Sequence, residues 1–180
     1  LESVRRGGEI AGGQRDMLEA IVVPHLRPVF NVVSDSFANL DGDLWKPVNA
    51  NRAHIERAIR SIGRIELSGV PGAAYGGTGF IVGPGLILTN HHVAEKFSPA
   101  SGFRNLTFLP GRSSAIDFKR EAESNESVTV EVKRVRMVHP HWDAAILEVD
   151  GLGPDRAPLT LAGEQPGEEA ICISIHPGTR

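Results

Sequence analysis

The chain has 180 residues, of which 41% are hydrophobic, so it can bury one substantial core or two small ones. Its 19 Lys and Arg against 22 Asp and Glu give a formal net charge of -3, without the basic excess that binding to nucleic acid or an anionic membrane requires, and we expect neither as a partner. No apolar stretch reaches the roughly 20 residues of a membrane-spanning helix, and the single cysteine, Cys172, excludes an intrachain disulfide and favours a cytoplasmic location.

The first 63 residues predict a leader followed by a helical arm. Residues 1–13 are rich in Gly and Arg and show no hydrophobic periodicity, which is typical of an irregular leader. Helical spacing then begins over residues 14–23. Pro24 and Pro28 stop or kink this first helix, because proline cannot donate a backbone hydrogen bond.

A second helix is predicted just before the first strand. Asn49 or Asn51 can cap its start, and Gly63 can end it. Its apolar stripe consists of Ile55, Ile59 and Ile62. The charged residues off this stripe indicate a solvated face. The alternating segment 64–67 then reads as the first strand of a β domain.

Residues 76–96, GGTGFIVGPGLILTNHHVAEK, have the pattern of a β-hairpin. Two apolar runs, Phe80–Val82 and Leu86–Leu88, flank a Gly-Pro-Gly turn, which predicts two short, buried strands. The second run continues into a polar segment that places His91 and His92 at the end of a rigid strand. A histidine held there suits proton transfer, because its unperturbed pKa lies near neutrality.

The rest of the β domain is predicted from shorter patterns. Over residues 97–127, apolar pieces alternate with Gly, Ser, Asn and charged residues, which indicates strands joined by exposed loops. Residues 128–138 read as one long strand with an outward charged face. That strand leads to Asp143, which opens a further apolar strand over residues 144–149.

Two of these segments resemble one known family. The Gly-Thr-Gly-Phe strand followed by Thr-x-x-His-Val, together with the later segment HPHWDAAILEV at 139–149, resembles trypsin-like serine peptidases of the chymotrypsin fold, particularly bacterial members without disulfides. The match covers roughly residues 64–180. By this resemblance His92 is the catalytic base, and Asp143, 51 residues later, is the carboxylate that orients it.

The resemblance also implies a fold and a class of substrate. We expect a mostly β protein with a six-stranded antiparallel barrel over residues 64–156 and an N-terminal helical arm over residues 1–63, packed on the outside. Residues 157–180 are expected to hold the link to a second barrel and, at 170–173, its first strand. Open strand edges favour a homo-oligomer or a retained partner segment. The substrate would be a protein or peptide, with no cofactor.

The chain lacks one part of the family's chemistry. A serine peptidase needs a serine nucleophile, an imidazole that takes its proton, and a carboxylate that orients the imidazole. No Gly-x-Ser-Gly motif follows Asp143, where the only serine is Ser174 inside an apolar run. We therefore expect a serine endopeptidase whose nucleophilic serine lies outside this chain, in a fragment or split enzyme. The 180-residue chain alone would then be inactive.

Two other functions stay open on the sequence. In the first, the barrel is catalytically dead and serves as a protein-interaction module. In the second, His139, His141 and Asp143 face one way along a strand and bind zinc, with His91 or His92 as a fourth ligand.

Overall fold

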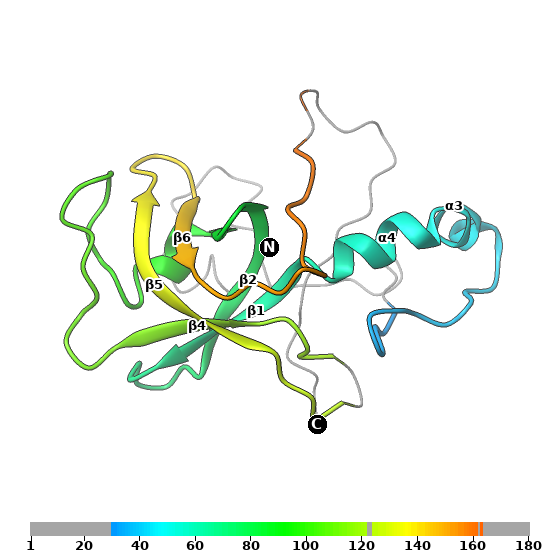
Figure 1. Cartoon of the computed structure of the whole chain (residues 1–180), viewed down its shortest axis with the longest axis horizontal. Helices are drawn as coiled ribbons and strands as arrows, with labels where there is room; N and C mark the ends of the chain where they lie inside the picture. The colour runs from blue at the N-terminus through cyan, green and yellow to red at the C-terminus, as the bar shows by residue number, and fades with distance from the viewer. Residues whose placement is uncertain (1–29, 122–123, 162, 164–180) are drawn as a thin grey trace, which may run out of the picture. The chain divides into compact units, whose positions relative to one another are not determined.

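The computed structural model describes residues 30–121, 124–161 and 163 (Figure 1). The predicted leader, the helix over residues 14–23 and the strand over residues 170–173 lie outside these residues, as does Ser174. In the described part of the chain, no helix is long and apolar enough to cross a membrane.

The described part of the arm contains three short helices (Figure 1). They are the 3-10 helix η1 (Asp43–Trp45), α3 (Lys46–Ala50) and α4 (Arg52–Ile59). Pro47 fits in the first turn of α3, where no intrahelical partner for its missing N–H is required. On α4, Ile55 and Ile59 are buried, as the apolar stripe predicts. The guanidinium of Arg52 lies 4.1 Å from the ring centre of buried Phe37 and thereby covers this small core.

The predicted end of the second helix is wrong. The helix stops at Ile59, and Ile62 and Gly63 belong to strand β1 (Ile62–Ser68) instead. A side chain at Gly63 would place its Cβ 2.6 Å from Ile116 Cγ1 on the neighbouring strand. Gly63 therefore allows two strands to approach each other and does not terminate a helix.

Six strands form a closed antiparallel barrel in the order β1-β2-β3-β6-β5-β4 (Figure 1). After β1 these are β2 (Tyr75–Gly83), β3 (Leu86–Thr89), β4 (Ser113–Asp117), β5 (Thr129–Val138) and β6 (Ala145–Val149). The prediction of a mostly β fold with a six-stranded antiparallel barrel and N-terminal helices is confirmed. Closure leaves the barrel itself without a free edge.

Alternating side chains fill the barrel interior. Ile65, Ile81 and Ile87 are fully buried there, each on a different strand. Gly79 lies among them, and a Cβ on it would come within 2.7 Å of Ile65 Cδ1. Glycine at position 79 therefore suits the packing, because a Cβ there would displace the side chains of Ile65 and Ile87.

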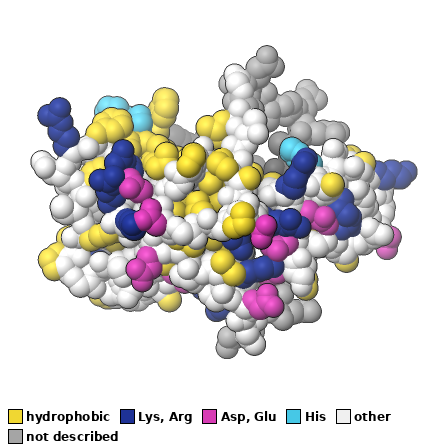
Figure 2. Space-filling view, in the orientation of Figure 1, with side chains coloured by type: hydrophobic (Ala, Val, Ile, Leu, Met, Phe, Trp, Pro, Cys, Tyr) yellow, Lys and Arg dark blue, Asp and Glu magenta, His cyan; other side chains and the backbone are white. Residues whose placement is uncertain are grey.

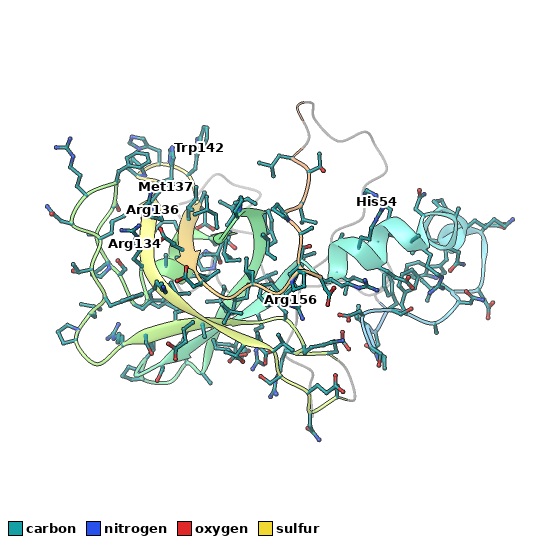
Figure 3. All side chains as sticks on the ribbon, viewed as in Figure 1. His54, Arg134, Arg136, Met137, Trp142 and Arg156 are labelled. Carbon is teal, nitrogen blue, oxygen red and sulfur yellow. The ribbon has the colours of Figure 1, made fainter. Side chains whose placement is uncertain are left out.

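The outward face of β5 carries both signs of charge (Figures 2 and 3). Arg134 and Arg136 both reach Glu148 on β6, at 2.9 Å and 3.3 Å. A register shift between Val132 and Arg134 lets Val132 and Val135 both point inward although they are three residues apart. The long strand with a charged outer face is thus present, with a bulge that the alternation alone does not reveal.

Candidate active site

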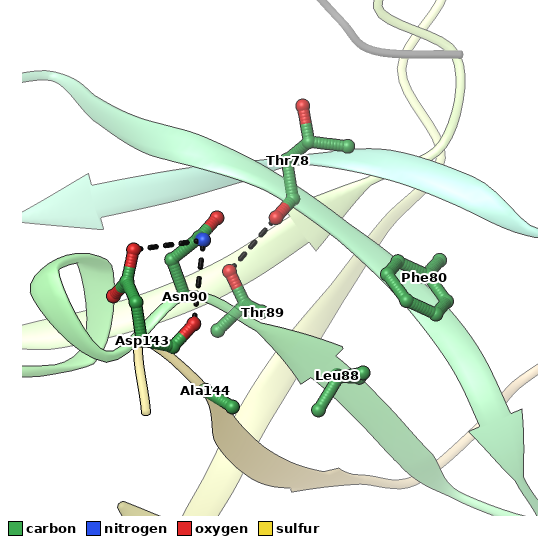
Figure 4. A pocket seen from close by; sticks show the side chains of 7 residues that line it. All are labelled: Thr78, Phe80, Leu88, Thr89, Asn90, Asp143 and Ala144. Carbon is green, nitrogen blue, oxygen red and sulfur yellow. Dashed lines mark hydrogen bonds between the residues drawn. The ribbon is translucent and has the colours of Figure 1, made fainter. Parts of the chain in front are cut away.

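Barrel topology brings together two segments that are far apart in the sequence. Strands β3 and β6 pair antiparallel, with Thr89 opposite Ala145, so the end of β3 meets the start of β6. Thr89 is buried, and its hydroxyl donates to the carbonyl oxygen of Thr78 at 2.8 Å (Figure 4). The segments that leave this pair of strand ends carry His92 and Asp143.

A single helical turn, α5 (His91–Ala94), follows β3 and orients the two histidines. Val93 is fully buried, and its side chain occupies the space beside Gly76, where a Cβ would lie 2.7 Å from Val93 Cγ1. The valine therefore anchors the turn in the barrel wall, while both His91 and His92 stay partly exposed. Gly76 on β2 thus leaves the space that the Val93 side chain occupies.

His92 and Asp143 are in direct contact. The imidazole Nδ1 of His92 lies 2.8 Å from Asp143 Oδ2, and the backbone N–H of His92 donates to Oδ1 at 2.9 Å. Because an ionised carboxylate can only accept, Nδ1 carries a proton, and in the neutral imidazole Nε2 then has the lone pair. The side chains are 30% and 43% exposed, so the pair is open to solvent on one side.

The surroundings keep Asp143 ionised. Partial burial raises the pKa of its carboxyl, but hydrogen bonds from the His92 amide and imidazole, attraction to His92 and a hydrogen bond from Asn90 outweigh it. The pKa of Asp143 therefore lies below its ordinary value. Such a carboxylate can stabilise a positive charge that forms on the imidazole.

His91 has a different neighbour from His92. Its Nε2 lies 3.8 Å from Oε2 of Glu95, the residue that follows α5. Of the two adjacent histidines, the one that the resemblance selects is thus the one in contact with Asp143, and His91 is directed toward Glu95.

The described residues do not bring together the ligands that the zinc hypothesis requires. The ring of His139 stacks on Trp142 at 4.5 Å, and its Nδ1 accepts N–H bonds from His141 and Trp142 at 3.2 Å and 2.9 Å. The carboxylate of Asp143 is bonded to His92. Among the residues that the structure describes, no three His, Cys, Asp or Glu side chains are grouped to hold a metal ion.

Neither the contact between Asn90 and Asp143 nor the cavity beside it was predicted from the sequence. Asn90 Nδ2 lies 3.0 Å from Asp143 Oδ2, a contact that no local pattern predicts across 53 residues. A cavity of about 220 Å³ opens at this point (Figure 4). It is lined by Thr78, Phe80, Leu88, Thr89, Asn90, Asp143 and Ala144. Its walls combine apolar strand residues with the polar groups around Asp143.

Comparison with known proteins agrees with the geometry. The family model described as "Trypsin-like peptidase domain" matches residues 77–180, more than half of the 180-residue chain. The matched segment contains α5 and four of the barrel's strands complete, β3 to β6, and therefore both His92 and Asp143. No curated protein matches the chain.

Proposed function

Because the chain belongs to the trypsin-like peptidase family and has a barrel of the chymotrypsin type, we propose that it is part of a serine endopeptidase with a His-Asp-Ser triad. His92 is the general base and Asp143 the carboxylate that orients it. The observation that carries this proposal is the 2.8 Å hydrogen bond between His92 Nδ1 and Asp143 Oδ2 at one end of the closed barrel. A peptidase domain implies a protein or peptide substrate.

The geometry supports a defined sequence of proton transfers. With its proton held on Nδ1 by Asp143, His92 presents the lone pair of Nε2 to the serine hydroxyl. Nε2 takes the hydroxyl proton while the serine oxygen attacks the substrate carbonyl carbon. The imidazolium that forms is stabilised by the ionised Asp143, and it then gives the Nε2 proton to the departing amine.

The serine is proposed to come from outside these 180 residues. No Gly-x-Ser-Gly motif follows Asp143, and Ser174 has no flanking glycines. We further propose that residues 157–180 begin a second barrel, which would carry the serine on a longer or associated polypeptide. The oxyanion hole would come from the backbone around that serine.

Labelling of the native protein with a fluorophosphonate probe, followed by intact-mass measurement, tests this proposal. We expect the label on a polypeptide that contains or accompanies this chain, together with cleavage of peptide substrates. His92→Ala should lower kcat by about 10⁶-fold and Asp143→Asn by about 10⁴-fold. The matched control is His91→Ala, which removes the neighbouring imidazole on α5 and should leave kcat unchanged.

Two results would contradict the proposal. One is a native preparation in which no polypeptide takes the label and no peptide is cleaved, which would favour the interaction-module alternative. The other is equal loss of kcat in the His91 and His92 variants, because α5 would then matter only as structure.

A further inference from the structure

We propose that Asn90 is a positioning residue for the pair of Asp143 and His92. Its side-chain amide fixes the carboxylate in the orientation that receives the Nδ1–H of His92. The inference rests on the roles proposed above for His92 and Asp143, and it concerns a residue that touches neither the substrate nor the reacting atoms.

The side-chain amide of Asn90 contacts two oxygens of the same residue. Nδ2 lies 3.0 Å from Asp143 Oδ2 and 3.4 Å from the carbonyl oxygen of Asp143 (Figure 4). Both oxygens are acceptors, so only the NH2 group of Asn90 can face them, and this settles the orientation of the amide. One donor group thus joins the carboxylate to its own main chain and restrains its rotation.

The side chain of Asn90 does not cap α5, although Asn90 stands at the N-cap position. It stands at the N-cap of α5, where an asparagine oxygen ordinarily accepts from one of the first backbone amides, but it makes no such bond. Instead the backbone N–H of His92 donates to Asp143 Oδ1 at 2.9 Å. Asp143 therefore performs the capping, and Asn90 donates to the other oxygen of the same carboxylate.

The three donors have separate effects on Asp143. Oδ2 accepts from both His92 Nδ1 and Asn90 Nδ2, and Oδ1 accepts from the His92 amide. Asp143 and Asn90 are exposed, so water competes for these bonds and their net contribution to stability is small. What Asn90 supplies is orientation: the carboxylate stays aligned with the imidazole, and the neutral imidazole keeps its proton on Nδ1.

The test compares Asn90→Ser and Asn90→Leu by ¹⁵N NMR of the neutral His92 imidazole. Serine is a good N-cap residue but is too short to reach Asp143, and leucine has the shape of asparagine without a donor or a charge. We expect Nδ1–H in the unmodified protein and a shift toward Nε2–H in both variants at mildly alkaline pH. The matched control is Asn49→Ser, since Asn49 Nδ2 donates to Leu40 in the arm at 2.7 Å.

In the complete peptidase, both variants should lower kcat about tenfold at unchanged KM, as expected for loss of one hydrogen bond to a charged group. Unchanged His92 tautomers in both variants would overturn the inference and leave Asn90 as a cap alone. If Asn90→Ser lowers the melting temperature, Asn90→Leu, which keeps the shape of the side chain without a donor or a charge, decides. Failure of the proposed function gives a different result: no turnover in the unmodified protein, with the tautomer shift still present.

Discussion

At the scale of single residues, Asp143 makes the stability of the fold depend on pH. Burial raises its pKa, but the hydrogen bonds from His92 and Asn90 lower it by more. A carboxyl whose pKa is depressed in the folded state stabilises the protein above its unfolded pKa of about 3.9. That contribution is lost as the pH falls through the folded-state pKa.

We therefore expect Asp143→Asn to lower the free energy of unfolding by a small amount near neutral pH and by less at about pH 2. Urea denaturation of both proteins at the two pH values measures the difference. The control is Asp41→Asn, at an exposed position in the arm. It should change the free energy of unfolding by the same amount at both pH values. A loss of stability for Asp143→Asn that is the same at both pH values would contradict the assignment.

At the scale of elements, the loop between β1 and β2 contains two glycines that are required for different reasons. Gly69 and Gly72 both have left-handed backbone, with φ of 71° and 75°. A Cβ on Gly69 would overlap the carbonyl oxygen of Gly111, whereas a Cβ on Gly72 would meet no atom within 4 Å. The first position needs glycine for space as well as for its conformation.

Substituting alanine at each position should reveal this difference. Gly72→Ala is expected to cost about 1–2 kcal/mol, the penalty of a left-handed conformation for a residue with a Cβ. Gly69→Ala should cost about 2 kcal/mol more, because the backbone around Gly111 must move. Urea denaturation of the two variants measures both values. Equal costs would mean that the loop moves away from Gly111 without penalty.

The hairpin of β2 and β3 could be predicted from the sequence, but the boundary between α4 and β1 could not. Two apolar runs around a Gly-Pro-Gly turn predict a hairpin, so β2 and β3 follow from local pattern. The prediction of His91 and His92 at the strand end itself is wrong, because β3 ends at Thr89 and both histidines lie on the helical turn α5 that follows. Ile62 is different, because it continues the helical spacing of Ile59 as well as the alternation of β1. Pairing of Ile62 with Phe80 on the neighbouring strand β2 decides between them, and that contact is not local.

At the scale of the whole described chain, a carboxylate fastens the arm to the barrel. Glu121, which follows β4, accepts N–H bonds from Ser34 at 2.5 Å and Asp35 at 2.8 Å. Lys119 adds an ion pair to Asp35 at 2.8 Å. Burial lowers the pKa of Lys119, but Asp35 and Glu121 outweigh it and raise the pKa. These partners lie more than 80 residues apart, so the sequence offers no pattern that predicts them.

The attachment can be tested with one substitution. Ser34 and Asp35 both have left-handed backbone, with φ of 55° and 60°, which is costly for residues other than glycine. The Glu121 side chain is 6% exposed, and removing it takes the acceptor from the amides of Ser34, which is exposed, and Asp35, which is partly buried. We expect Glu121→Ala to speed hydrogen exchange at Ser34 and Asp35 about 10–100-fold.

The barrel amides of β2 and β3 should keep their protection in this variant, since the core around Ile81 and Ile87 does not depend on Glu121. Glu126→Ala is the matched control: Glu126 is exposed in the same connection between β4 and β5 and should leave Ser34 and Asp35 unaffected. Unchanged exchange at these two amides in Glu121→Ala would show that the turn holds its left-handed conformation by itself. Faster exchange across the whole barrel would show that the arm and barrel unfold as one cooperative unit.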